Sequence, residues 1–493
     1  MVHSERPFLS DLRRKQLAYL KTALNWVLLR TAFHSTTTLA LPCNFAKHEP
    51  MTSVDTIFAV ATPPGRSAIA VIRISGPQAG DAPALFAASC PAAGQFCMAR
   101  LRIGDQVIDE AVILFMAAPH SSTGEHVCEI HCHGSVAVRQ LILDKLAQSI
   151  GFRLAYAGEF TRRAFMNDKM DLLAVEGLAD MIEAETPQQL YQAWSQIDGA
   201  LRGPVTKWRA NLVSVASQLE ALIDFADEDL PAHLEIILRQ QTAALITDIA
   251  TILDDNRAGE LTRDGVVVAL VGPVNAGKST ILNGLAGRAA AIVSDQAGTT
   301  RDIVSVRLNI HGVPTQILDT AGLRDTPGRV EAEGIRRSVE AAQHADLVIL
   351  IVDASSSRWS EEADDITGRM GRADLLVLNK TDKGMIGTGP PEAISLSAQD
   401  DKDIIKLMAR LGNMIMPHNQ AQNHAVITRL RHRQSLIDAH DALHAGLQHD
   451  FHQAPELAAE DFRQAAVALG RITGDVDVEE LLGQIFSSFC IGK

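Results

Sequence analysis

A glycine-rich stretch that ends in Lys278 and Ser279 carries the clearest chemical signal in this sequence. From Gly272 it has the spacing GxxxxGK(S/T), after a predicted strand at 266–271 and before a predicted helix at 279–285. Backbone N–H groups of such a loop cradle a polyphosphate, assisted by the positive end of the helix. The lysine supplies charge to the outer phosphates and the serine hydroxyl binds Mg²⁺. A chance glycine-rich turn is the alternative, but the strand–loop–helix order favours a nucleotide site.

Three further segments are typical of a guanine-nucleotide site. The polar loop Gly298–Asp302 contains threonines that could reach the metal, and a predicted strand at 315–318 leads into the DxxG turn Asp319–Gly322. A second predicted strand, 375–378, leads into Asn379–Asp382. The carboxylate that ends this motif can accept two N–H groups of guanine, which adenine cannot supply. A site whose buried polar groups need those donors discriminates strongly between the two bases.

The residue after the DxxG turn departs from the Ras-type pattern. In Ras-type switches a glutamine at this place orients the attacking water, whereas this chain has Leu323, which neither donates nor accepts a hydrogen bond. Glu331 could act instead through a bridging water. The alternative is a solvated carboxylate near the start of a helix, where negative charge is favoured. The water is therefore oriented by another group or by a partner.

Beyond these motifs, the chain resembles the MnmE (TrmE) family of tRNA-modification GTPases from about Thr52 to Lys493. Four groups of residues outside the nucleotide motifs carry the resemblance, and the last of them, FCIGK at the C-terminus, is highly specific. They are Ala61–Arg66 with Ile72–Gly76, Thr123–Glu125 with Glu129–Gly134, Gly158–Phe165 with Asn167–Lys169, and Phe489–Lys493. The resemblance implies a multidomain protein with an α+β N-terminal folate-binding domain, an all-α helical domain and an inserted α/β P-loop GTPase domain of the Ras-like, doubly wound type.

Changes in hydrophobic periodicity predict the domain limits. Short alternating strands predict an α+β domain over 51–167, and spacings of three and four residues predict helices over 168–263 and 421–493. Alternating strands and helices predict the G domain over 264–420, entered through a hinge-like segment at Gly259–Asp264. The G domain is therefore predicted to be inserted into the helical domain, so that its movements can pass to the helices on either side.

The resemblance implies a GTPase that is activated by potassium-dependent dimerisation of its G domains, without an external arginine finger. A monovalent cation beside the phosphates can neutralise developing charge where other systems use arginine. The roles implied by the resemblance are K⁺ binding by Asn275, Ser294, Gln296 and Thr299, Mg²⁺ binding by Ser279 and Thr300, and catalysis by Glu331, which orients the water, with Lys278. The predicted GTP-binding residues are Asn275, Ala276, Gly277, Lys278, Ser279, Thr280, Ser294, Asp295, Gln296, Ala297, Gly298, Thr299, Thr300, Asp319, Thr320, Ala321, Gly322, Asn379, Lys380, Asp382, Ser397 and Ala398.

The N-terminal part is similar to folate-binding aminomethyltransferase-like domains, and the resemblance implies that it holds a 5-formyltetrahydrofolate-type folate. The matching positions are Arg73, Glu129, Lys169 and Lys493. A carboxylate suits the N–H edge of a pterin, and arginine or lysine suits the glutamate tail. Without the resemblance, Arg73 would be interpreted as an outward residue of an edge strand.

Two groups of thiols could carry chemistry. Cys490 is a candidate catalytic nucleophile, and a small buried group in the C-terminal tail is an equally good interpretation. The run from Cys128 to His133 contains possible metal ligands, although its spacing is not a CxxC framework. Strand alternation predicts Cys128, Ile130 and Cys132 on one face and Glu129, His131 and His133 on the other.

The resemblance also implies the reaction and the partners. The chain would help to install an aminomethyl-type group, such as carboxymethylaminomethyl, at C5 of the wobble uridine of certain tRNAs, with folate as the one-carbon source. It would act as a homodimer with an MnmG/GidA-like protein in a heterotetramer or larger complex, and FAD would enter only through that partner. Two other functions remain open: a ribosome-assembly GTPase of the Era or Der type, and a stand-alone folate-dependent one-carbon transferase with a regulatory G domain.

Composition agrees with a large intracellular protein. The chain has 493 residues, 46% of them hydrophobic, and a net charge of −14, which argues against a histone-like nucleic-acid binder but not against a basic patch for tRNA. Six scattered cysteines suggest free thiols in a reducing compartment, and no uninterrupted apolar run is long enough to predict a membrane span. We expect a cytoplasmic protein. The extension 1–50 is expected to be poorly packed, either as a mis-annotated start or as an organellar transit peptide.

Overall fold

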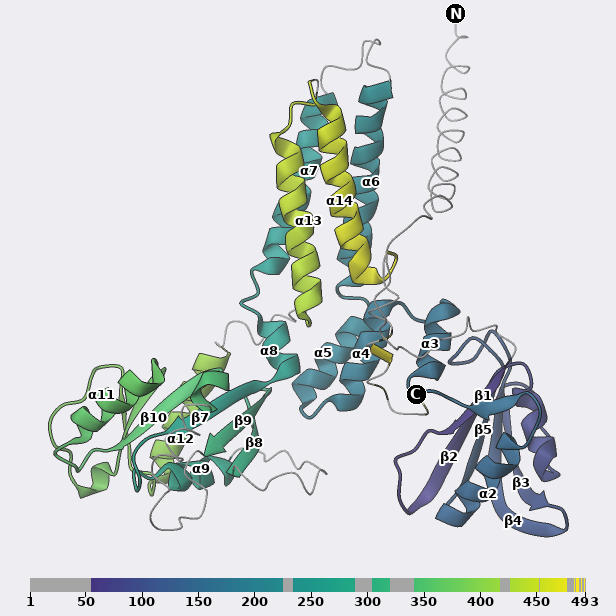
Figure 1. The fold of residues 1–493 in the computed structure, drawn as a ribbon, viewed down its shortest axis with the longest axis horizontal. Coiled ribbons are helices and arrows are strands. Elements are labelled where there is room, and N and C mark those ends of the chain that lie inside the picture. Colours follow the sequence, from purple (N-terminus) through teal and green to yellow (C-terminus); the bar gives the residue numbers. More distant parts are fainter. Residues whose placement is uncertain are drawn as a thin grey trace, which may run out of the picture. The chain divides into compact units, whose positions relative to one another are not determined.

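The structure of the chain is a computed structural model that describes residues 55–224, 234–288, 304–319, 341–416, 426–451, 453–476, 483, 485–486, 489 and 492. The predicted extension, residues 1–50, lies outside these ranges. The described chain contains two six-stranded sheets and a set of long helices (Figure 1). This confirms the expected multidomain fold, whereas the domain limits stay a prediction.

The first sheet has the strand order β3-β4-β5-β2-β1-β6, with only the β1–β6 pair parallel. A 3-10 helix, η2 (Ala79–Phe86), and α2 (Val136–Ala147) pack their apolar side chains with those of the sheet in one core. The strands are β1 (Thr56–Val60), β2 (Ser67–Ser75), β3 (Gln95–Ile103), β4 (Gln106–Met116), β5 (Val127–Gly134) and β6 (Phe152–Leu154). Because β2 lies between β5 and β1, the interpretation of Arg73 as an edge-strand residue is wrong.

The second sheet has the order β12-β11-β10-β7-β9-β8 and is parallel except for the β8–β9 hairpin. Helices α9 (Lys278–Ala286) and α12 (Asp401–Ile415) share one apolar core with it, and α11 (Trp359–Met370) belongs to a second core. Two separate cores around a parallel sheet are the mark of a doubly wound fold. The strands are β7 (Val266–Val271), β8 (Val304–Ile310), β9 (Val313–Asp319), β10 (Leu347–Asp353), β11 (Leu375–Asn379) and β12 (Ile394–Ser395), with a 3-10 turn, η3 (Thr381–Lys383).

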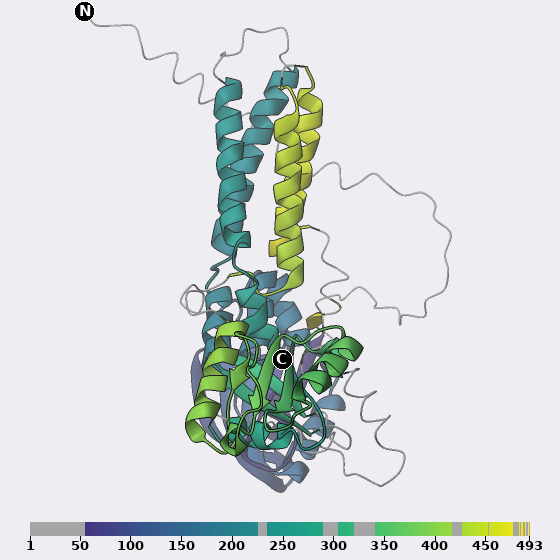
Figure 2. The ribbon, with the colours of Figure 1, turned by 90° about the vertical axis from the view of Figure 1, so that its left-hand side faces the viewer.

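Four long helices form a bundle (Figures 1 and 2). Two of them precede the second sheet in the sequence and two follow it: α6 (Arg202–Asp224), α7 (Leu234–Leu253), α13 (Leu430–Gln448) and α14 (Pro455–Thr473). Their buried side chains form one core, as helical spacing predicts. Among the described helices, α7 alone is long and apolar enough to span a membrane by length and composition. Its residues Leu238, Leu245, Ile246 and Ile249 are buried in the bundle core, whereas Ile236 and Ile237 are exposed.

Four shorter helices accompany the bundle: α3 (Glu159–Met166), α4 (Leu172–Glu183), α5 (Pro187–Ile197) and α8 (Ala258–Asp264). The segment expected to be a hinge is instead helix α8, with Glu260 and Thr262 buried. Helix α5 begins at a capping box on Thr186. Its side chains contact the segment before the second sheet in the sequence and the segment after it. Gln189, Gln192 and Gln196 donate to the carbonyls of Arg263, Gly259 and Val426 at 2.9, 3.0 and 2.5 Å.

A buried charged cluster ties α4 to α13. Glu176 accepts hydrogen bonds from His432 at 2.9 Å and from Arg431 at 2.5 and 2.7 Å. Burial alone would raise the pKa of Glu176, but the hydrogen bonds from His432 and Arg431 outweigh it and hold that pKa far below its usual range. Burial lowers the pKa of His432, whose Nε2 lies 2.9 Å from Glu176 Oε2. An internal anion with these partners is stable only while they remain in place.

Candidate functional site

Glycines give the phosphate loop a shape that other residues could not adopt. Gly272, after β7, has φ +148°, and a Cβ there would lie 2.0 Å from the Ile351 carbonyl oxygen of β10. Gly277 has φ +98°, and its Cβ would lie 2.1 Å from the Asn379 amide nitrogen. Both the positive φ and the close approach therefore require glycine. The loop is held against the carboxyl ends of two neighbouring strands.

Lys278 and Ser279 open α9 directly after this loop. The buried Lys278 ammonium donates to the carbonyls of Gly272 and Pro273 at 2.7 and 2.8 Å, and burial lowers its pKa. The Ser279 hydroxyl donates to Asp319 at 2.5 Å. A hydroxyl and a carboxylate are hard oxygen groups of the kind that Mg²⁺ prefers, so the residues present fit this ion. The lysine can give its N–H bonds to phosphate oxygens without leaving the loop.

Asn379 ties the end of β11 to the phosphate loop and to the loop after β12. Its amide donates to the Ala276 carbonyl at 2.7 Å and accepts from the Ala398 N–H at 3.0 Å. The Ser397 hydroxyl donates to Asp382 at 2.7 Å. Three separate loops are therefore joined where a guanine base is expected. The Asp382 side chain is exposed there and can accept the N–H groups of that base. Sequence reasoning proposed all of these positions but could not assign their mutual hydrogen bonds.

Asp353 is a residue of this site that sequence reasoning missed. It ends β10 and accepts a hydrogen bond from Lys380 at 2.8 Å. Burial works against its charge, but the hydrogen bonds from Lys380 and from the hydroxyl and N–H of Ser355 together outweigh that effect and lower the pKa of Asp353. The signal was present, because an apolar run ends in a carboxylate at the same edge of the sheet as the other motifs.

On the first sheet, Arg73 and Glu129 form an ion pair from neighbouring strands, with Arg73 Nε 2.8 Å from Glu129 Oε1. His131 Nε2 lies 3.0 Å from the other oxygen, Glu129 Oε2. Burial would raise the pKa of Glu129, but hydrogen bonds from His131 and Arg73 outweigh it and lower that pKa. Glu129 is therefore an ionised acceptor. His131 was not predicted as part of this site, although its place two residues after Glu129 on the same strand indicated it.

The face of β5 that carries Glu129 was predicted correctly. Cys128, Ile130 and Cys132 belong to the core, whereas Glu129 and His131 are partly exposed and His133 is exposed. The four cysteines that the structure describes are free thiols, as expected. Within the described ranges, no three His, Cys, Asp or Glu residues are grouped as metal ligands.

The other two predicted folate residues are placed less completely. Lys169 follows α3, and its ammonium donates to the Pro119 carbonyl at 3.0 Å. Lys493 lies outside the described residues, as does Cys490. Gly492 is described: it has φ +109°, and a Cβ there would lie 2.3 Å from the Val60 carbonyl oxygen. Gly492 therefore lies against β1, the strand beside β2.

Comparison with known proteins gives the family. The model of the MnmE helical domain matches residues 172–490, and that of the GTP-binding protein TrmE N-terminus matches residues 56–169. The chain is 47% identical over 451 residues to the tRNA modification GTPase MnmE of Parvibaculum lavamentivorans, covering 89% of this chain and 100% of that protein. The chain belongs to the MnmE family of tRNA modification GTPases. The MnmE protein of Cereibacter sphaeroides strain ATCC 17025 is 44% identical over 450 residues, with 89% and 100% covered.

A solved structure of Aquifex aeolicus Era bound to GDP.AlF4- matches 36% of this chain and 66% of its own at 25% identity, with a TM-score of 0.24. So low a TM-score carries no argument about function. Membership of the MnmE family rests on the sequence matches, and it confirms the resemblance on which the expectations were built.

Much of the predicted hydrolytic machinery lies outside the described residues. Of the four predicted K⁺ ligands, only Asn275 is described, at φ +63° in the phosphate loop. All the Mg²⁺ and K⁺ assignments, those of Ser279 and Asn275 included, and the role of Glu331 stay predictions. The predicted residues outside the described ranges are Ser294, Asp295, Gln296, Ala297, Gly298, Thr299, Thr300, Thr320, Ala321, Gly322, Glu331, Cys490 and Lys493.

Proposed function

We propose that this chain is a potassium-activated GTPase that helps to modify C5 of the wobble uridine of certain tRNAs. Membership of the MnmE family supports the GTPase activity and the link to tRNA modification. The observation that carries the nucleotide part is that Asn379 hydrogen-bonds both the phosphate loop, at Ala276, and the loop of Ser397 and Ala398, where Ser397 pairs with Asp382. We propose a cytoplasmic location.

In this proposal each described residue of the nucleotide site has a distinct task. Mg²⁺ and K⁺, when bound, supply positive charge beside the β- and γ-phosphates. Ser279 offers its hydroxyl to Mg²⁺, Lys278 donates to phosphate oxygens, and Asn275 contributes to the K⁺ site. Asp382 accepts two N–H groups of guanine. Glu331 orients the attacking water, as the family resemblance implies.

The second part of the proposal is a folate site on the first sheet. Glu129 is ionised and partly exposed, so it can accept N–H groups of a pterin, while Arg73 and Lys169 provide cations for the glutamate tail. The residues present therefore fit a formyltetrahydrofolate. We propose that folate supplies the one-carbon unit and that an FAD- and NADH-using protein of the MnmG type joins a homodimer of this chain.

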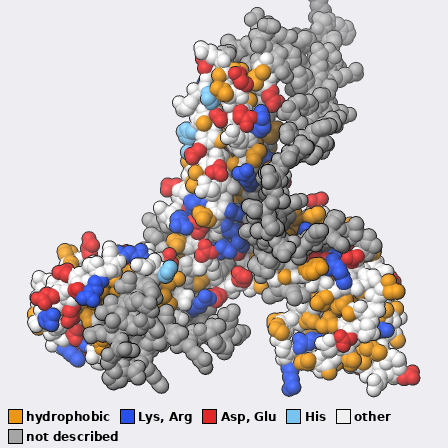
Figure 3. Space-filling view, viewed as in Figure 1, with side chains coloured by type: hydrophobic (Ala, Val, Ile, Leu, Met, Phe, Trp, Pro, Cys, Tyr) orange, Lys and Arg blue, Asp and Glu red, His pale blue; other side chains and the backbone are white. Residues whose placement is uncertain are grey.

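Charge distribution bears on the tRNA part of the proposal. On the face that Figure 3 shows, acidic side chains are interspersed with Lys and Arg over the described residues. Phosphate binding favours clustered cations, so a basic partner would supply part of the tRNA contact. Mass spectrometry of tRNA nucleosides from a deletion strain, with and without this chain, tests the function. An equal level of wobble-uridine modification with and without the chain would contradict the proposed function. Restoration of modification in vitro without the flavoprotein would favour the stand-alone transferase.

Potassium is expected to raise GTP turnover by about 10-fold or more over sodium, because a bound cation stabilises charge in the transition state. The measurement is GTP hydrolysis in KCl and in NaCl at equal ionic strength. Choline chloride serves as the control for ionic strength. Equal rates in the three salts would contradict the potassium mechanism and leave the GTPase activity itself untouched.

Replacing Glu129 with glutamine is expected to weaken 5-formyltetrahydrofolate binding by about 10- to 100-fold, since a charged acceptor is lost. The measurement is isothermal titration calorimetry on the full chain. Glu110→Gln is a matched control, because Glu110 lies on β4 of the same sheet in a longer, exposed pair with Arg100 at 3.8 Å. Equal affinities for the two variants would contradict the proposed role of Glu129.

A further inference from the structure

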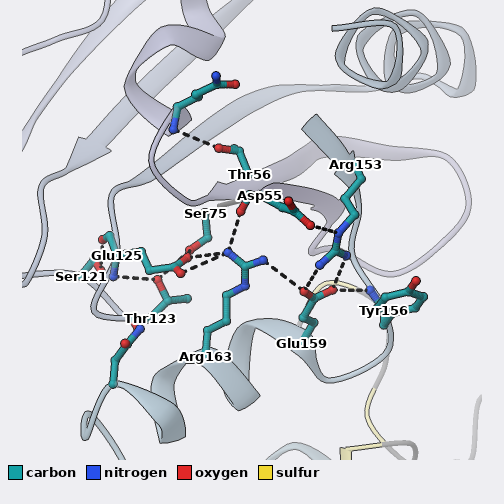
Figure 4. A network of polar contacts seen from close by, with 12 residues as sticks. Asp55, Thr56, Ser75, Ser121, Thr123, Glu125, Arg153, Tyr156, Glu159 and Arg163 are labelled. Atoms are coloured by element: carbon teal, nitrogen blue, oxygen red, sulfur yellow. Dashed lines mark hydrogen bonds and ion pairs between the residues drawn. The ribbon is translucent and has the colours of Figure 1, made fainter. Parts of the chain in front are cut away.

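A buried ion-pair network lies between α3, the start of β1 and the loop before β5 (Figure 4). At its centre is Arg163, whose side chain is 5% exposed. Its Nη1 donates to both carboxylate oxygens of Glu125, at 2.9 and 3.1 Å, and to the Asp55 carbonyl at 2.9 Å. Its Nη2 donates to Glu159 at 3.2 Å. One guanidinium therefore links α3 to the start of β1 and to the loop before β5.

The two carboxylates of this network differ in their dependence on Arg163. Glu159 also receives two hydrogen bonds from Arg153, at 2.6 and 2.9 Å, and one from the Tyr156 N–H at 2.9 Å. Among the described residues, Glu125 has Arg163 as its only cationic partner. Loss of Arg163 would therefore leave the mostly buried Glu125 without a counter-charge, which is far more costly than loss of an exposed pair.

Glu125 belongs to a loop that is tied to the folate face of the first sheet. The Ser75 hydroxyl donates to Glu125 at 2.8 Å and lies 2.7 Å from the Thr123 hydroxyl. Ser75 is two residues from Arg73 on β2, so both side chains point to the same face of the sheet. The Asn167 amide donates to the Thr123 carbonyl at 2.7 Å. The network therefore holds the loop and helix α3 beside the Arg73–Glu129 pair.

Each end of helix α3 lies next to a residue that is predicted to bind folate. Near its start, the Phe160 ring lies under the Arg73 guanidinium, 5.9 Å from its central carbon. Beyond its end, Lys169 donates to the Pro119 carbonyl, at the start of the same loop. Gly158 precedes the helix at φ +67°, and a Cβ there would lie 2.6 Å from the Phe486 carbonyl oxygen. A shift of α3 would therefore displace Arg73, Lys169 and the C-terminal tail together.

We propose that Arg163 is a positioning residue of the folate site: by pairing with Glu125 it fixes the loop Pro119–Glu125 and helix α3, and thereby sets Arg73 and Lys169 for the ligand. This inference rests on the proposed folate function. Arg163 gives its hydrogen bonds to Glu125, Glu159 and the Asp55 carbonyl, so it acts on the folate only through the residues that it holds in place. Its removal acts on affinity through geometry.

The test measures binding of 5-formyltetrahydrofolate to the full chain by calorimetry, with the thermal midpoint of unfolding and GTP turnover as parallel readouts. Arg163→Met is expected to weaken binding at least ten-fold and to lower the midpoint, while GTP turnover stays within two-fold. Arg433→Met is the matched control, because Arg433 is a similarly buried arginine, paired with Asp255 and Glu260. It is expected to lower the midpoint and to leave folate affinity within two-fold.

A double variant, Arg163→Met with Glu125→Gln, separates positioning from stability. It removes the unpaired buried charge, so the midpoint is expected to recover towards wild type while folate affinity stays weak. The double variant also provides the test if Arg163→Met alone does not fold. Wild-type affinity in the folded double variant, or equal weakening in Arg433→Met, would overturn the inference. Absence of folate binding by the wild-type chain would instead contradict the proposed function.

Discussion

Replacing Lys278 with alanine is expected to lower kcat/KM for GTP hydrolysis by about 10²- to 10³-fold, the usual effect of removing one preorganised donor from developing charge. The ammonium is buried at the mouth of the phosphate loop and is held by two backbone carbonyls, so water cannot readily take its place. The measurement is steady-state phosphate release at saturating and at low GTP.

Arg369→Ala is the control for this variant. Arg369 lies on α11, which packs on the same sheet, and makes an exposed ion pair with Asp365, at 2.8 Å. Its loss is expected to leave turnover unchanged, since such pairs contribute little. Turnover of Lys278→Ala within three-fold of wild type, in a protein that still melts cooperatively, would contradict the assignment of the phosphate loop.

Replacing Glu176 with alanine is expected to cost about 3–5 kcal/mol of the free energy of unfolding of the helical part, the usual effect of breaking a buried ion pair. Arg431 and His432 would lose the anion to which they donate. The measurement is hydrogen exchange in α4 and α13, because a multidomain chain need not unfold in two states. Glu361→Ala, in an exposed pair with Arg358, is the control and is expected to change exchange very little.

The same cluster should make the helical part acid-sensitive. The pKa of His432 is lowered in the folded state. Below about pH 6.5, the usual pKa of histidine, the unfolded state therefore binds a proton that the folded state does not, and the free energy of unfolding falls. The pKa of Glu176 is lowered as well, so a second loss of stability follows below about pH 4.3. Exchange in α4 and α13 that slows as the pH falls from 7 to 5, after correction for the intrinsic rate, would contradict this sign.

The nucleotide motifs were predictable because their geometry is local. The strand predicted at 266–271 is β7 with the same limits, and the strand predicted at 375–378 is β11, one residue longer. A glycine-rich loop between a strand and a helix has few possible shapes. The carboxyl ends of parallel strands then meet at one edge without further information.

The folate face was less predictable, because its residues are neighbours only through the sheet. Without the family resemblance, Arg73 would be interpreted as an edge-strand residue, yet β2 lies inside the sheet and Arg73 reaches Glu129 on β5. Likewise, the expected hinge is helix α8, whose backbone carbonyls accept from Gln189 and Gln192 of α5. Strand order and helix contacts of this kind depend on residues far apart in the chain, which periodicity cannot pair.

By itself, the sequence determined the fold class, the phosphate loop and the guanine motif, because short-range spacing and backbone freedom decide each of them. Only the tertiary structure decided that Asn379 joins three loops, that His131 completes the Arg73–Glu129 group, and that Arg163 pairs with Glu125. These contacts depend on how strands and helices from distant segments pack together. A buried charge must find its partner in that packing, whatever their separation along the chain.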